Sequence, residues 1–175
     1  MATTAAGTPY VESSDLVASY PGVSLALANH IDTIGKVLQV VRATDSTSRS
    51  TTSASFVDAN LSVTITPQRT DSTLILILNV SAINNISSGT DTRSITVITD
   101  SSNNLLTGPT GYVVGTLGTA IGQFGVPLTI MTQVASASLA ARTYKARFRS
   151  LAAPVTAIHS NNDTPGQMYA IEVAA

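Results

Sequence analysis

The chain has 175 residues, nine of them basic and ten acidic, so its formal net charge is −1 and only 11% of its residues are charged. Soluble domains carry about 25% charged residues on average, whereas this chain holds 46 serines and threonines. This balance argues against a nucleic-acid partner and favours association between copies over repulsion. The absence of cysteine excludes disulfides and thiolate metal sites.

The first 35 residues are predicted to form an arm. Residues 1–7 are expected to be flexible and residues 8–11 extended. Ser14-Asp15 is a favourable helix N-cap pair that opens a short turn, which Pro21 is expected to stop.

The N-terminal segment lacks a charged start followed by an apolar stretch, so we expect no signal peptide. The longest apolar run of the chain has five residues, far short of the roughly 20 of a spanning helix, so we expect no membrane insertion.

A helix is predicted over residues 23–34, because apolar side chains recur there at helical spacing. Gly35 is well placed to end this helix, and Leu25 and Ala28 widen its apolar face. So short a helix is marginal in water by itself. It must therefore pack against its own β-domain, against copies of itself, or against a host surface. Its stripe consists of Val23, Leu27, Ile31 and Ile34.

Residues 36–175 are predicted to form one β-domain, because short β-branched runs alternate there with turn residues. Eight to ten such strands without interleaved helices favour an all-β fold, an antiparallel sandwich or barrel, with a jelly roll as the natural candidate. The expected strands are residues 37–42, 53–57, 61–66, 73–83, 93–99, 128–134, 142–150, 155–159 and 168–173, with a further strand near 112–114.

Apolar and polar residues alternate cleanly in residues 61–66 and 144–149, which predicts one buried and one solvated face for each strand. The alternation disappears in residues 74–78, so we expect that strand to be covered on both faces. Residues 108–125 hold six of the eleven glycines. One interpretation of these glycines is a long surface loop. The other is a functional segment, either packed closely near a symmetry axis or forming an adaptable contact loop.

The sequence selects no catalytic, cofactor-binding or metal-binding residues. Neither His30 nor His159 has a second ligand at metal-binding spacing. Nothing selects a glycosidase pair or a Ca²⁺ site near Asp91 or Asp163. Most of the scattered aspartates fall in turns, where aspartate bonds the nearby backbone: Asp45, Asp58, Asp71, Asp91, Asp100 and Asp163. We therefore expect a protein that is not an enzyme and has no cofactor.

The densest charged feature is a basic row on one predicted strand. A solvated outer face is one interpretation of this row, and a contact with carboxylates of a neighbouring subunit or a host shell is the other. No aromatic residues interleave on that face, which argues against nucleic-acid binding. The basic row, with one arginine just before it, consists of Arg142, Lys145, Arg147 and Arg149.

Residues 37–82 resemble virion proteins of tailed bacteriophages. The shared pattern is a T-S-x-S-F-V-D segment, here residues 52–58, then L-S-V-T-I-T-P at 61–67 and an apolar strand at 73–80. Residues 143–149 and 168–173 resemble the last strands of such domains, and residues 8–32 are similar to leading segments of phage fibre proteins. The likeness is loose over residues 84–138. It implies a trimeric, jelly-roll-like domain on the virion surface.

From this resemblance we expect a homotrimeric capsid decoration or cement protein, synthesised in the host cytoplasm, whose partner is the major capsid protein or another virion protein. No residues are left for a shaft, which favours decoration over a fibre. The alternative is a short tail fibre or receptor-binding tip that recognises a host-surface glycan through residues 84–91 and 108–125. An enzyme acting on polysaccharide is a third hypothesis. The residues expected to dock on the particle are Tyr10, Val11, Leu16 and the helix stripe Val23, Leu27, Ile31 and Ile34.

Overall fold

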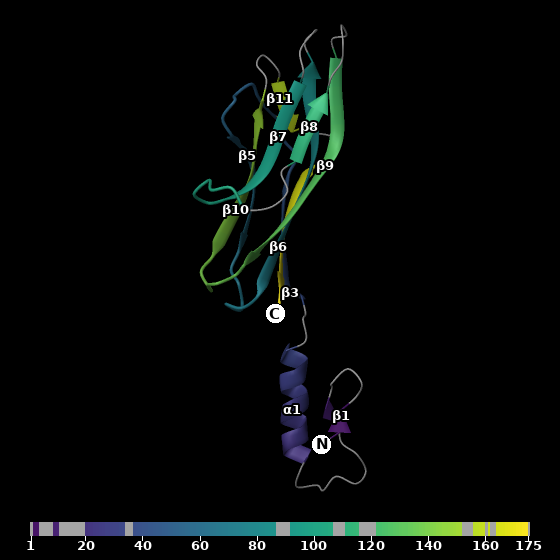
Figure 1. Ribbon diagram of the computed structural model, residues 1–175, viewed down its shortest axis with the longest axis vertical. Coiled ribbons are helices and arrows are strands. Elements are labelled where there is room, and N and C mark those ends of the chain that lie inside the picture. The colour runs from purple at the N-terminus through teal and green to yellow at the C-terminus, as the bar shows by residue number, and fades with distance from the viewer. Residues whose placement is uncertain are drawn as a thin grey trace.

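The computed structural model describes residues 2–3, 9–10, 20–33, 37–86, 92–106, 111–115, 122–151, 156–159, 161 and 164–174. Figure 1 shows an elongated β-sandwich with a smaller N-terminal part beyond one of its ends. That part contains α1 (Tyr20–Thr33) and the two-stranded pairing of β1 (Ala2–Thr3) with β2 (Pro9–Tyr10). The expected all-β class is confirmed, since ten strands follow the helix and their pairings are antiparallel.

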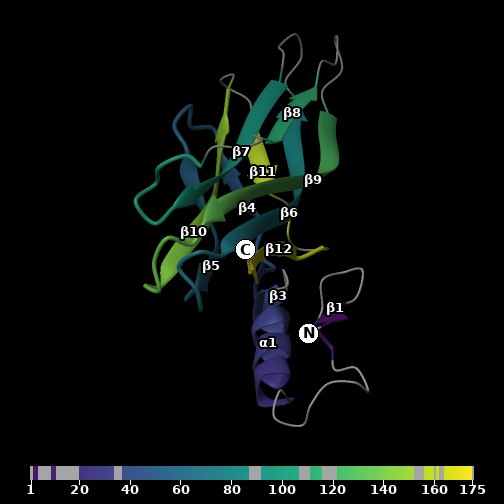
Figure 2. The ribbon, with the colours of Figure 1, turned by 60° about the horizontal axis from the view of Figure 1, so that its bottom comes forward.

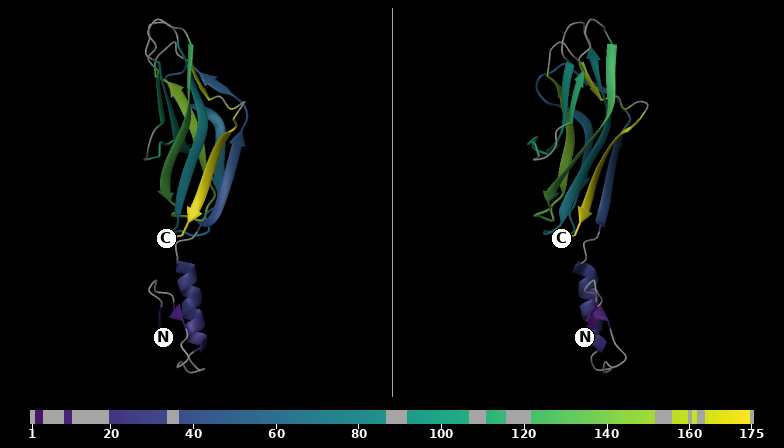
Figure 3. Two further views of the ribbon diagram at one scale, coloured as in Figure 1. Left: turned by 90° about the vertical axis from the view of Figure 1, so that its right-hand side faces the viewer. Right: turned by 45° about the vertical axis from the view of Figure 1, so that its right-hand side comes forward.

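The sandwich has two layers, which Figure 3 shows edge-on. The four-stranded sheet has the order β5 (Val57–Ile65), β10 (Arg142–Ser150), β7 (Thr92–Asp100) and β8 (Gly111–Gly115). The six-stranded sheet has the order β3 (Val37–Asp45), β12 (Gly166–Val173), β6 (Thr73–Ile86), β11 (Thr156–His159) and β4 (Arg49–Thr51), and β9 (Gly122–Ala135) pairs with the other edge of β6. Figure 2 shows β9 following β6 across the sheet.

The core forms where the period-two pattern turns one face of each strand inward. Leu74, Leu76 and Leu78 of β6 are fully buried and share one cluster with Tyr144 and Phe148 of β10. Burial also alternates along β5 and β12, as residues of the two opposed sheets meet. Each fully buried large apolar side chain contributes about 1.5–3 kcal/mol, and this packing must suffice because the chain has no disulfides.

Most predicted strands are confirmed, but the strand expected over residues 53–57 is wrong. Only Val57 belongs to a strand, the first residue of β5. Within the loop, Oγ of Ser53 accepts from the main-chain N–H of Ser55 at 3.0 Å, and the N–H of Ser53 donates to Oγ1 of Thr51. Hydroxyl side chains that bond the adjacent backbone compete with a sheet ladder, which explains the loop.

Three further expectations need correction. Pro21 does not stop a turn: it lies in the first turn of α1, where a proline has no hydrogen bond to lose. The strand over residues 74–78 is fully covered on one face only, since Ile75 and Ile77 on the other face are only half-buried. In the glycine-rich segment, the described residues are not one loop, because β8 and the first residues of β9 lie within it. Ser14, Asp15 and Gly35 lie outside the described residues.

The carboxylate of Glu172 is buried at the end of the sandwich nearest α1. Oγ of Ser72 donates to it at 2.5 Å and Nε2 of Gln39 at 2.6 Å, and the main-chain N–H groups of Gln68 and Arg69 also donate. Burial alone would raise the pKa of Glu172, but these hydrogen bonds outweigh it and hold the pKa below its usual value. The interaction joins β12, β3 and the turn before β6.

We expect Glu172→Gln to lower the free energy of unfolding by about 2–3 kcal/mol at pH 7, because buried donors lose a charged acceptor. The folded-state pKa lies below the unfolded value of 4.5. The stability from Glu172 is therefore complete above pH 4.5 and is lost as the pH falls through the folded-state pKa. Urea denaturation from pH 7 to 3 measures both effects. Asp71→Asn, at an exposed carboxylate in the same turn, is the control and should change little; equal effects of the two substitutions would contradict the assignment.

Candidate functional site

The arm carries the predicted docking residues. Figure 1 shows α1 beyond the end of the sandwich, with the β1–β2 pair beside it, and the helix packs on β2. Leu27 is half-buried, and Leu25 is 62% exposed. Leu25 therefore offers an apolar surface that neither the sandwich nor β2 covers. Val11, Leu16 and Ile34, and the side chains of Tyr10, Val23 and Ile31, lie outside the described residues.

Lys145, Arg147 and Arg149 lie on the outer face of β10, whereas Arg142 shares the parity of the inward-facing Tyr144 and is not on that face. Each of the four side chains is bonded within the chain. Nη1 of Arg142 donates to the main-chain carbonyls of Ala135 and Ser136, both at 2.7 Å. Nζ of Lys145 donates to Oδ1 of Asn103 at 2.6 Å. These bonds fix the start of β10 against the end of β9 and against the loop after β7.

Arg147 and Arg149 hold the loop of residues 53–56 against β10. Nη2 of Arg147 donates to the carbonyl of Phe56 at 2.5 Å, and Nη1 of Arg149 donates to the carbonyl of Ala54 at 3.0 Å. The guanidinium of Arg149 also lies over the ring of Phe56, 4.9 Å from its centroid, a cation–π contact. The contact of the basic row with a neighbouring subunit stays a prediction.

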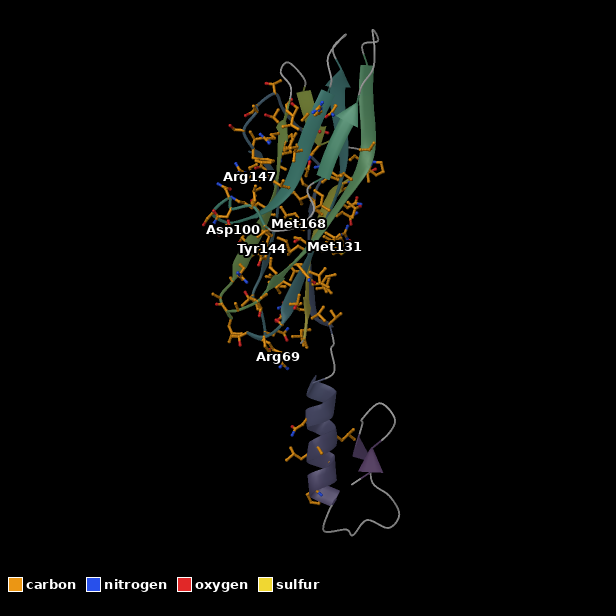
Figure 4. The ribbon with its side chains drawn as sticks, in the orientation of Figure 1. Arg69, Asp100, Met131, Tyr144, Arg147 and Met168 are labelled. Carbon is orange, nitrogen blue, oxygen red and sulfur yellow. The ribbon has the colours of Figure 1, made fainter. Side chains whose placement is uncertain are left out.

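A cavity of about 240 Å³ opens beside the start of β10, between Asp100, Leu106, Val134 and Tyr144. Figure 4 shows Asp100 and Tyr144 close together, and the two residues are cross-strand partners. Burial raises the pKa of Tyr144, Arg142 lowers it and Asp100 raises it further. The hydroxyl of Tyr144 has no hydrogen-bond partner among the described residues, but it is itself inaccessible, so a molecule in the cavity would not reach it.

His159 is buried between the two sheets. Its ring stacks on Phe148 with centroids 4.2 Å apart, and its Nε2 lies 2.8 Å from Oγ1 of Thr96. Phe148 and Thr96 belong to the four-stranded sheet and His159 to the six-stranded sheet. Burial lowers the pKa of His159 from 6.5 to about 4, since the charged form is poorly solvated there. The neutral ring is thus a structural connection between the sheets. The side chain of His30 is not among those described.

Sequence reasoning missed one surface, the outer face of the six-stranded sheet. On this face Val40 and Met131 are 56% and 54% exposed, and Ile75 and Ile77 between them are half-buried. The lost alternation in residues 74–78 was the available signal. It predicted a strand covered on both faces, whereas the described residues fully cover only the inner face.

Within the described part of the chain, no three histidine, aspartate or glutamate side chains gather as metal ligands would. None of the described helices has the length and apolarity needed to cross a membrane.

No model of a known protein family matches the chain, and no curated protein is significantly similar to it.

We expect acid to destabilise the fold through His159. In the unfolded chain His159 is protonated near pH 6.5, whereas in the folded chain it is protonated only near pH 4. This stability is therefore complete above pH 6.5 and declines as the pH falls toward 4, by about 2 kcal/mol at pH 5. Urea denaturation at pH 7 and pH 5 should show this loss in the natural chain and not in His159→Gln, which retains a polar group for Thr96. A loss of the same size in the variant would assign the proton to another group.

Proposed function

We propose that the protein is a structural component of a bacteriophage virion, a homotrimeric decoration or cement protein on the outer surface of the capsid. Its sandwich is the knob that projects from the particle, and residues 1–35 attach it to the major capsid protein or another virion protein. The trimer bridges neighbouring capsid subunits and adds buried area that resists internal pressure.

The strand order supports a jelly roll for the knob. A jelly roll packs two sheets of interleaved strands. In this chain β3, β12, β6 and β9 are neighbours in one sheet and β5, β10, β7 and β8 in the other. Consecutive strands change sheets at β5, β6, β7, β9, β10 and β11, so the connections cross the ends of the sandwich. Such a body is rigid and leaves its surfaces free for contacts with other proteins.

The observation that carries the proposal is the position of the arm. α1 extends beyond the sandwich and leaves Leu25 62% exposed. An isolated helix of 14 residues is marginal in water, so burial on a larger assembly would stabilise it. The resemblance of residues 8–32 to leading segments of phage fibre proteins points to a virion as that assembly.

Leu25→Lys tests the docking. Burying a leucine contributes about 1.5–3 kcal/mol, so its replacement by lysine should weaken binding to phage particles that lack the protein by at least about tenfold. Cosedimentation with purified particles measures this affinity. Leu105→Lys is the matched control, because Leu105 is 58% exposed and belongs to the loop after β7, and it should bind as the natural chain does.

Deletion of residues 1–35 completes the test. If the shortened protein and Leu25→Lys both bind particles normally, docking through the arm is wrong. If the natural chain fails to bind capsids but binds host cells, the tail-fibre alternative replaces decoration. Imaging of intact particles labelled on this protein locates it on the head or the tail in either case.

A further inference from the structure

The outer face of the six-stranded sheet has an apolar centre. Register places Ile77 between Tyr169 and Met131, and the next row places Ile75 between Ile171 and Gln133. The inner-face neighbours of these residues are fully buried, so their own side chains point away from the core. No other described element of the chain packs on the centre of this face. Isoleucines in such a position are typical of a surface that another protein covers.

This face is nearly without charge. The two long strands β6 and β9, with 14 residues each, contain no charged residue at all. Asn79 and Thr129 form a polar row beside the isoleucines, where Nδ2 of Asn79 donates to Oγ1 of Thr129 at 2.8 Å. Within the described part of the chain, Arg42 places a charge beside the row of Ile77 and Tyr169, and its guanidinium lies 5.8 Å from the ring centroid of Tyr169.

A face with so little charge suits contact with copies of itself. Close to a three-fold axis a residue lies near its own equivalents, so a charge there would meet like charges in a desolvated contact. A face that binds a charged partner would instead carry charges opposite to those of the partner. Figure 4 shows Met131 and Arg147 on opposite sides of the sandwich, so the basic row does not interrupt this face.

The edge of β9 adds a second, independent indication. Among the described strands β9 pairs with β6 alone, so no described strand covers its other edge. Monomeric proteins protect such edges with lysine or other charges, and β9 has none. Its one proline, Pro127, removes a single backbone donor. An edge without such protection is tolerated when an assembly covers it.

We infer that the outer face of the six-stranded sheet, centred on Ile75, Ile77 and Met131, is the surface through which copies of this chain associate, with β6 and β9 nearest the symmetry axis. The inference rests on the proposed homotrimer and assigns its contact. Four strands lie about 4.8 Å apart, and four successive outward-facing side chains along each strand lie about 6.8 Å apart, so this part of the sheet face has an area of roughly 500 Å². This is of the order of the ~800 Å² that each partner contributes to a stable interface.

Met131→Lys in the full chain tests the assignment. Three lysines would meet near the axis, so the dissociation constant of the oligomer should rise at least 100-fold, measured by sedimentation equilibrium. Leu139→Lys is the matched control, because Leu139 is also 54% exposed but lies in the loop between β9 and β10. It should leave the dissociation constant unchanged. Circular dichroism checks that each variant is folded, and Val40→Lys, at 56% exposure, is a second substitution on the same face.

The outcomes separate this inference from the proposed function. If the natural chain forms trimers that Met131→Lys and Val40→Lys leave intact, the trimer stands and this face is not its contact. If the natural chain is monomeric at micromolar concentrations, self-association through this face is wrong, while particle labelling still decides the virion proposal. Dissociation by both face variants and not by Leu139→Lys supports the inference.

Discussion

The packing of one leucine row of β6 against the aromatic residues of β10 holds the two sheets together, and the rest of the sandwich depends on it. Two buried polar side chains, Glu172 and His159, fix this packing at two separate positions along the core. Glu172 lies opposite Leu74 on β12, and His159 lies opposite Ala82 on β11. The two residues are thus about 27 Å apart along β6. The apolar contacts supply most of the free energy, while the two buried polar groups specify which strands and turns meet.

Alternation made much of this fold predictable. Strands with one buried and one solvated face, such as residues 61–66 and 144–149, could be identified from the sequence because the side-chain period is two. The same parity would also have placed Glu172 among the buried residues, since it alternates with half-buried positions of β12 just as Met168 and Ala170 do. The error at residues 53–57 has a local cause, because hydroxyl-to-backbone bonds cannot be distinguished from strand propensity in a serine-rich chain.

The candidate site was predictable only in part. The helical stripe and the basic row follow from local spacing, so the sequence could place their members on one element. What each element touches depends on tertiary contacts, and here the sequence was insufficient. Arg147 and Arg149 bond a loop some ninety residues away, which no local pattern encodes. The half-buried isoleucines of β6 were expected to be covered on both faces of the strand, because an apolar run has the same appearance whether its cover comes from the same chain or from another.

The low charge of the chain is unevenly distributed, and this distribution links the fold to the proposed assembly. The outer face of the four-stranded sheet carries Lys145, Arg147 and Arg149, which stabilise loops of their own chain, whereas β6 and β9 carry no charge. A monomer that depends on charge for solubility has no reason to leave its longest strands uncharged. An assembly has such a reason, because a charge buried in a contact between copies carries a desolvation cost, and a charge next to the symmetry axis also meets its own equivalents.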